Sequence, residues 1–360
     1  MKKQVLNIFK FLLFLGIGLT IFYLVYQKQN TAFQEDCALK NIPLADCSLA
    51  HKVIIDFSRI NFWWILAVVG GFTISNISRA IRWNMLLRPL GYQPRMINAF
   101  GTILIGYFAN LGLPRMGEVV RAGLMSRYER ISVEKVFGTI VVDRAIDVIS
   151  IFVFTGLAIL LQFEVIWNFI EENVNLSERF GGKGHLLAIV GIVFAAVAGG
   201  AYIFRKSLMR AALFRKIVTI ATGFWQGIKS VGQVDRPWLF VLHSVNIWMM
   251  YFAMTYLLFQ AFPPTAGLSI LTVLVVFVFG AWGVVIPSPG GMGTYHFLAQ
   301  LALSIYGVSG NDGFSWANIS FFSVQLGSNV LGGLLFLLLL PAINKNYSGA
   351  PTTPTATPAV

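Results

Sequence analysis

Long apolar runs alternate with short polar or charged stretches along the chain, and each run is about 20 residues long, enough to cross a bilayer as a helix. A helix satisfies its backbone hydrogen bonds internally, which lipid cannot do for it. The pattern predicts an all-α polytopic membrane protein with about eight transmembrane helices. The predicted spans are 11–26, a helix that begins at Asn61, 140–163, 186–204, 238–262, 268–286, the helix after residue 294, and 315–340.

The apolar segment 96–113 differs from these spans because glycines and Asn110 interrupt it and arginines flank it on both sides. Basic residues gather on the cytoplasmic side of a membrane. We therefore predict that this segment enters the membrane and returns to the same side as a re-entrant segment. Interrupted backbone is tolerated at that depth only where protein or a water-filled cavity satisfies it.

Two breaks of similar composition, one in each half of the chain, interrupt the apolar pattern. Residues 111–118 read LGLPRMGE and residues 286–293 read IPSPGGMG. Paired Gly/Pro breaks in corresponding positions are typical of a transport site at the interface of an inverted repeat. The helices that follow the breaks begin with free N–H groups that favour an anion. Packing alone is the alternative explanation for such breaks.

Charged residues concentrate around the first break, although the chain has few of them. Arg115, Glu118 and Arg121 follow at i, i+3 and i+6, which predicts one shared helical face. Ionisable groups near lipid are costly unless they are paired or line a wet cavity. We predict one cavity open to the cytoplasm, with Arg115 as the phosphate ligand; ordinary interface arginines and structural ion pairs are the alternative. The residues expected to bind substrate are Arg79, Arg82, Asn110, Arg115, Glu118, Arg121, Asp143, Arg144, Asp147, Pro289, Gly290, Gly291 and Gly293.

The composition supports this class of protein. Hydrophobic residues make up 56% of the chain, charged residues only 12%, and the mean hydropathy is +0.72, which excludes a soluble globular protein. The net charge of +12 is explained by basic cytoplasmic loops and contact with anionic lipid headgroups. No basic, aromatic-rich soluble domain remains to hold nucleic acid, so we predict no nucleic-acid partner.

Charge also predicts the topology. The basic segments 88–96, 115–135 and 205–236 are expected in the cytoplasm with both termini, and the loops 27–60 and 164–184 outside. We expect one transmembrane domain over 1–345, followed by a disordered cytoplasmic tail, 346–360, rich in Pro, Thr and Ala.

The two cysteines, Cys37 and Cys47, both lie in the predicted external loop 27–60. They are expected to form a disulfide if the loop faces an oxidising compartment, the alternative being two free thiols. The four histidines are scattered without metal-ligand spacing, and no GxxxxGK[ST] phosphate loop is present. We therefore predict no metal, no cofactor and no ATP hydrolysis by this chain.

Four ordered motifs carry a family resemblance. They are SRAIRW at 78–83, NLGLPRMGEVVR at 110–121, Asp143-Arg144-x-x-Asp147, and Pro-x-Pro-Gly-Gly-x-Gly at 287–293. Over about residues 5 to 345 the chain resembles the flippase-like family of the transmembrane region of lysylphosphatidylglycerol synthase (multiple peptide resistance factor). The resemblance implies a helical bundle that moves an anionic or aminoacylated phospholipid across the bacterial inner membrane. Only a short tail follows the last predicted span, so the synthase domain of those relatives is not expected.

Other functions stay open. Gly138 followed by Asp143 and Asp147 faintly resembles the metal-binding aspartates of CDP-alcohol phosphotransferases, but that chemistry needs further aspartates a turn or two earlier, which are missing here. An integral-membrane enzyme of lipid or polyprenyl metabolism is therefore the first alternative. A non-transporting partner of an envelope-lipid synthase is the second, and a homo-oligomer is compatible with either.

Overall fold

The structure is a computed structural model that describes residues 2–39, 42–43, 47–112, 115–174, 232 and 234–349. Every regular element in these residues is a helix. The predicted span 186–204, nearly all of the basic segment 205–236 and the tail from residue 350 lie outside the described residues. The elements are α1 (Lys2–Leu39), α2 (Leu49–Ser58), α3 (Phe62–Leu87), η2 (Arg88–Leu90), α4 (Met96–Gly112), α5 (Met116–Glu129), α6 (Val133–Val174), α11 (Pro237–Ala261), α12 (Pro263–Ala266), α13 (Ile270–Val285), η3 (Pro289–Gly291), α14 (Thr294–Ser304), α15 (Gly310–Phe321), η4 (Phe322–Ser328) and α16 (Asn329–Ile343).

Four helices of the described part are long and apolar enough to cross a membrane: Phe62–Leu90, Val133–Phe169, Pro237–Ala261 and Gly310–Ile343. They coincide with four predicted spans, and α1 contains the predicted first span. Many apolar side chains on their outer faces are exposed, as expected of surfaces that lipid covers. The predicted class, an all-α polytopic membrane protein, is confirmed.

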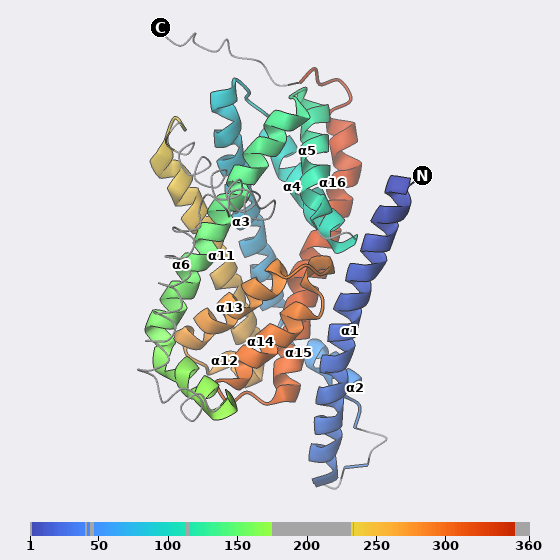
Figure 1. Ribbon diagram of the computed structural model, residues 1–360, viewed down its shortest axis with the longest axis vertical. Helices are drawn as coiled ribbons and strands as arrows, with labels where there is room; N and C mark the ends of the chain where they lie inside the picture. Colours follow the sequence, from blue (N-terminus) through green and yellow to red (C-terminus); the bar gives the residue numbers. More distant parts are fainter. Residues whose placement is uncertain are drawn as a thin grey trace, which may run out of the picture.

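The helices α4 and α5 form a hairpin that starts and ends at the same end of the bundle (Figure 1). At 17 residues, α4 is about 25 Å long, less than the roughly 30 Å of a bilayer core. The two helices approach closely because Gly106 and Gly117 face each other. The side chain of Asn110 joins them, since its Oδ1 accepts a hydrogen bond from the Gly117 N–H at 2.7 Å. The predicted re-entrant segment 96–113 is thus the first limb of a hairpin, the single helix α4. The return limb is α5, which corrects the expectation that all of 115–135 lies in the cytoplasm: α5 packs back along α4 inside the bundle.

A second hairpin, α13–α14, corrects the predicted count of spans. The segment 268–286 and the helix after residue 294 were expected to cross the membrane, but α13 has 16 residues and α14 only 11. At about 1.5 Å per residue neither spans a bilayer core. The two helices pack through Gly283, where an added Cβ would lie 2.7 Å from the Cα of Tyr295. They form a hairpin that enters from the end opposite to α4–α5 (Figure 1).

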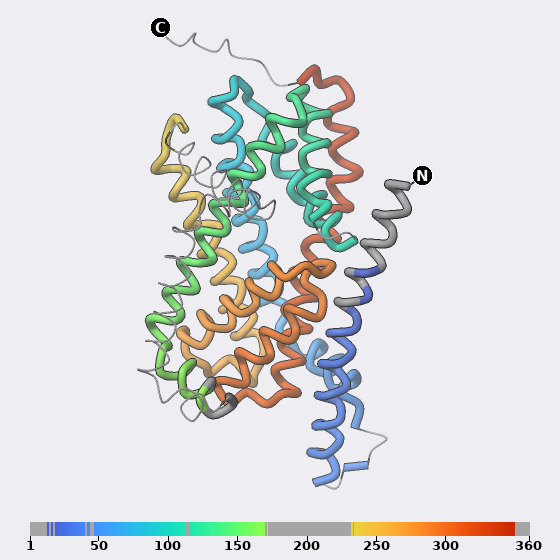
Figure 2. The backbone as a smooth tube through the Cα atoms, viewed as in Figure 1, coloured from blue at the N-terminus to red at the C-terminus, as the bar shows by residue number. Residues whose placement is uncertain are grey.

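The turns of the two hairpins meet midway along the bundle (Figure 2). Gly290 of η3 faces Leu111 at the end of α4, so closely that a Cβ at Gly290 would lie 2.6 Å from the Leu111 side chain. Gly290, Gly291 and Gly293 all have positive φ, a conformation that glycine adopts without strain. Both predicted breaks are therefore real turns, and they oppose each other as an inverted pair would.

The basic residues expected in the cytoplasm gather at one end of the bundle, where α3, α5 and α16 end and α6 begins (Figure 1). We call it the basic end; its described members are Arg88, Arg95, Arg127, Arg130, Lys135, Arg236 and Lys345. The opposite end carries α2 and the predicted disulfide, which the structure confirms between Cys37 and Cys47. Lys52 of α2 is held there by Asp56 at 2.6 Å and by Asp312 of α15 at 2.8 Å.

The close approach of α4 and α5 makes a testable prediction. In Gly117→Ala the new methyl group would overlap the Gly106 carbonyl oxygen and the Asn110 side chain, so the hairpin has to open. We expect a loss of about 1–3 kcal/mol in the free energy of unfolding. The matched control is Gly123→Ala in the same helix, where an added Cβ meets nothing within 4 Å. Thermal unfolding of the purified proteins distinguishes them, and equal stability of the two variants would contradict the packing described here.

Candidate functional site

Two arginines of α3 and two aspartates of α6 form the centre of a charge network. Arg79 Nη1 donates to Asp147 Oδ2 at 2.7 Å and to Asp143 Oδ2 at 3.3 Å. Arg82 donates from Nε to Asp143 Oδ1 at 2.9 Å and from Nη2 to Asp147 Oδ1 at 2.8 Å. The spacing explains the pattern, because residues three or four apart lie on one face of a helix. Each arginine therefore bridges both carboxylates.

The helix α5 of the first hairpin joins this network through Arg121. Its Nη1 donates to Asp143 Oδ2 at 3.1 Å, and its guanidinium lies 3.6 Å from the centre of the Trp83 ring. Trp83 is fixed in turn by a hydrogen bond from its Nε1 to Thr139 Oγ1 at 2.9 Å. A planar guanidinium suits both contacts at once. The hairpin is thus anchored to α3 and α6 by a buried cation.

The edge of the network is more exposed. Arg144 of α6 lies with Nε 3.1 Å from Glu118 Oε1 of α5, and with Nη1 3.5 Å from Asp147 Oδ2. The Arg144 side chain is 37% exposed, whereas that of Asp143 is completely buried. The predicted approach of Arg144 to Asp147 at i+3 is confirmed, although Asp147 has shorter contacts with Arg79 and Arg82. The network therefore has a buried core and an open side at Arg144 and Glu118.

The charges of the network do not balance. Four arginines face three carboxylates, which leaves one excess positive charge among the described residues of the network. Within the described part, Nε of Arg79 and both Nε and Nη2 of Arg121 are buried without a hydrogen-bond partner. Buried donors without partners are costly. A positive site with free donors is chemically suited to an anion such as a phosphate.

Arg115 lies elsewhere than the spacing predicted. It precedes α5 in a left-handed conformation with φ 66°, so it is not on the helical face of Glu118 and Arg121. The reason is the break at 112–114: the helix begins only at Met116. Arg115 is exposed at the turn of the first hairpin, and no ion pair joins it to the rest of the described chain.

The remaining predicted residues have structural roles in the two turns. Asn110 caps the start of α5 through the Gly117 N–H. Pro289, Gly290 and Gly291 make up η3, and Gly293 precedes α14. In the described chain this turn contacts the end of α4 through Gly290 and Leu111. The structure thus brings Arg79, Arg82, Glu118, Arg121, Asp143, Arg144 and Asp147 together, and brings Arg115 and Asn110 to the meeting point of the two turns.

Sequence reasoning missed the contribution of α11. Ser244 Oγ accepts from Arg82 Nη1 at 3.2 Å, and the Tyr251 hydroxyl accepts from Arg79 Nη2 at 3.4 Å. The two residues are seven apart and share one helical face. That spacing of two hydroxyl side chains in an apolar helix is the signal that could have identified them. In the residues described, no cluster of three or more His, Cys, Asp or Glu residues could hold a metal ion.

Fold and site together define a polytopic helical membrane protein with a buried charge network beside two opposed re-entrant hairpins. A family model described as the transmembrane region of lysylphosphatidylglycerol synthase matches residues 49–341, so the chain belongs to this family. The resemblance of the four motifs is thereby confirmed.

The chain is similar to three curated proteins that are named UPF0104 membrane proteins. A UPF0104 membrane protein of Methanocaldococcus jannaschii is 23% identical over 307 residues, covering 78% of this chain and 86% of its own. One of Methanothermobacter thermautotrophicus is 25% identical over 269 residues, covering 68% and 76%. One of Pyrococcus horikoshii is 31% identical over 111 residues, covering 30% and 33%. No solved structure matches the chain.

Proposed function

We propose that this protein is a membrane lipid translocase that moves an anionic or aminoacylated phospholipid between the two leaflets. The observation that carries the proposal is the meeting of two re-entrant turns from opposite ends of the bundle, with the exposed Arg115 in the first of these turns. Broken helices that meet midway in a membrane protein are typical of transport sites. The family match to the transmembrane region of a lipid synthase supports a lipid as the cargo.

The charge network supports the same proposal. Arg115 follows directly on the break that leads into α5, and α5 carries Arg121 into the network. A phosphate that contacts Arg115 therefore lies on the α4–α5 hairpin. The buried ion pair between Arg121 and Asp143 holds this hairpin in position. Arginine is suited to this task because its forked donors match the oxygens of a phosphate. We place the basic end in the cytoplasm of a bacterial cell, with both termini, because basic residues favour that side.

The test is lipid movement by the purified protein in liposomes. Vesicles would carry fluorescent phosphatidylglycerol, lysyl-phosphatidylglycerol or phosphatidylcholine, and a membrane-impermeant quencher would report the fraction that reaches the outer leaflet. We expect faster exchange of the first two lipids than of phosphatidylcholine, and faster exchange than in protein-free vesicles. Rates equal to those of protein-free vesicles for every lipid would reject the translocase, and would favour a lipid enzyme or a partner of a lipid synthase instead.

A further inference from the structure

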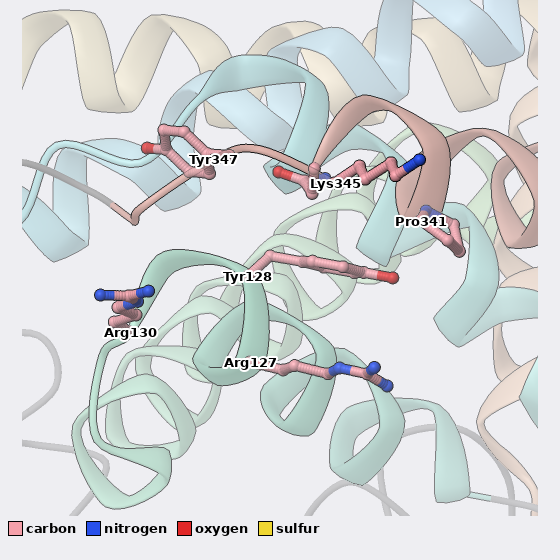
Figure 3. Close-up of a pocket in the computed structure, with 7 residues that line it drawn as sticks. Arg127, Tyr128, Arg130, Pro341, Lys345 and Tyr347 are labelled. Carbon is pink, nitrogen blue, oxygen red and sulfur yellow. The ribbon is translucent and has the colours of Figure 1, made fainter.

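A second candidate site lies at the basic end, away from the charge network. A pocket of about 340 Å³ opens between the end of α5 and the end of α16. It is lined by Arg127, Tyr128, Arg130, Pro341, Asn344, Lys345 and Tyr347. Arg127 and Lys345 extend their charged ends to the side where the Tyr128 hydroxyl lies, whereas Arg130 extends to the opposite side (Figure 3). In this view the charged ends of Arg127 and Lys345 flank the Tyr128 side chain, one on either side of it, near the end that carries the hydroxyl (Figure 3).

The acid nearest in sequence forms no ion pair with these cations in the described chain. Glu129 is 1% exposed, and its carboxylate is occupied: Oε1 accepts from Asn98 Nδ2 at 2.6 Å and from the Arg95 N–H at 3.0 Å. Its Oε2 accepts from the Tyr347 hydroxyl at 2.8 Å. In the described chain no ion pair involves Arg127, Arg130 or Lys345. Three cations of the pocket thus stand against one buried carboxylate, which leaves an excess of positive charge.

The wall of the pocket is held in place independently of any ligand. The guanidinium of Arg95 lies 4.0 Å from the centre of the Tyr347 ring. Burial and the hydrogen bond to Glu129 raise the pKa of Tyr347 to about 12. The hydroxyl therefore stays protonated at neutral pH and keeps donating to Glu129. A wall that is already ordered lowers the entropy lost when a ligand binds.

The pocket lies where an exposed apolar stripe of α16 ends. Leu331, Leu334 and Leu338 are exposed on the helix that leads to Pro341, and their spacing to Pro341 places them on the same side. A bilayer lipid that lies along this stripe carries its headgroup to the level of the pocket. Clusters of basic residues at this level of a membrane protein bind anionic headgroups.

We propose that the pocket binds the phosphate of an anionic phospholipid, held by Arg127 and Lys345 with the Tyr128 hydroxyl, while the acyl chains lie along α16. Guanidinium and ammonium groups bind phosphate by charge-assisted hydrogen bonds, and the tyrosine hydroxyl adds a neutral donor. This lipid is a bound partner at the rim of the bundle. It is distinct from the cargo of the proposed transport site, and the inference does not depend on translocation.

Native mass spectrometry of the full chain with added phosphatidylglycerol tests the proposal. We expect Arg127→Gln/Lys345→Gln to weaken lipid retention by roughly tenfold or more, because two charges near the headgroup are lost. Each single variant should lie between this double variant and the wild type. Arg88→Gln removes an exposed arginine at the same end but outside the pocket, and should bind as the wild type does.

Two results would overturn the proposal. The first is equal retention of phosphatidylglycerol by the double variant and the wild type, with unchanged thermal unfolding as the check that both are folded. The second is displacement of the lipid by millimolar inorganic phosphate, which would assign the pocket to a soluble phosphate-bearing ligand. If the wild type retains phosphatidylglycerol in excess phosphate, and only replacement of Arg127 and Lys345 abolishes this retention, the result supports a lipid as the ligand of the pocket.

Discussion

Asp143→Asn should destabilise the protein more than any other single change in the charge network. The Asp143 carboxylate is fully buried and accepts hydrogen bonds from Arg79, Arg82 and Arg121, which come from two different helices. Neutralising it leaves Arg79 and Arg82 with Asp147 as their remaining anion, and it removes the one ion pair that Arg121 makes in the described chain. Loss of one member of a buried ion pair costs roughly 3–5 kcal/mol, because the remaining charge is uncompensated. The measurement is the thermal unfolding midpoint together with the monodisperse yield.

A matched control and a rescue sharpen this experiment. Glu118→Gln removes a carboxylate of the same network that is partly exposed and has one ion pair, with Arg144, so it should cost at most about 1 kcal/mol. Adding Arg121→Met to Asp143→Asn removes one of the stranded cations and should recover part of the loss. An Asp143→Asn protein that unfolds at the wild-type temperature would show that the network contributes no net stability.

Arg115→Ala should abolish lipid translocation while the protein still folds. Arg115 is exposed and is joined by no ion pair within the described chain, so its removal strands no partner. Arg115 belongs to the turn of the first hairpin, which meets the turn of the second, and the headgroup is proposed to bind there. We expect the exchange rate in liposomes to fall at least about tenfold, as when one charge-assisted contact to a phosphate is lost.

The backbone of Arg115 offers a second variant that separates charge from folding. Because φ is 66°, a non-glycine residue is strained here by about 1 kcal/mol, and Arg115→Gly should relieve that strain. Both Arg115→Ala and Arg115→Gly should lose transport, with the glycine variant at least as stable as the wild type. Arg115→Lys should keep part of the rate, and Arg88→Ala should keep all of it. A wild-type rate in Arg115→Gly would mean that the headgroup site is elsewhere.

Much of the fold follows from the order of apolar and polar residues alone. The four long spans, the distinct character of the segment 96–113 and the two breaks were predicted because each depends on local properties: length, hydropathy and the conformational freedom of glycine. The return limb α5 was not predicted, since its residues were expected in the cytoplasm. The disulfide was predictable for a similar reason, since Cys37 and Cys47 are only ten residues apart. The second hairpin was not predicted, because α13 is as apolar as a transmembrane helix. Only its short length and its packing against α14 distinguish it from one.

The sequence by itself determined that Asp143 and Asp147 share one helical face and that Arg79 and Arg82 share another, because helical periodicity fixes neighbours three or four residues apart. Only the tertiary structure decided that these two faces meet, that Arg121 joins them, and that α11 contributes Ser244. Contacts between helices depend on how they pack, which no local pattern specifies. For the same reason Arg115, predicted on the face of Glu118 and Arg121, lies at the turn instead: it precedes α5 in a left-handed conformation, and the helix begins only at Met116.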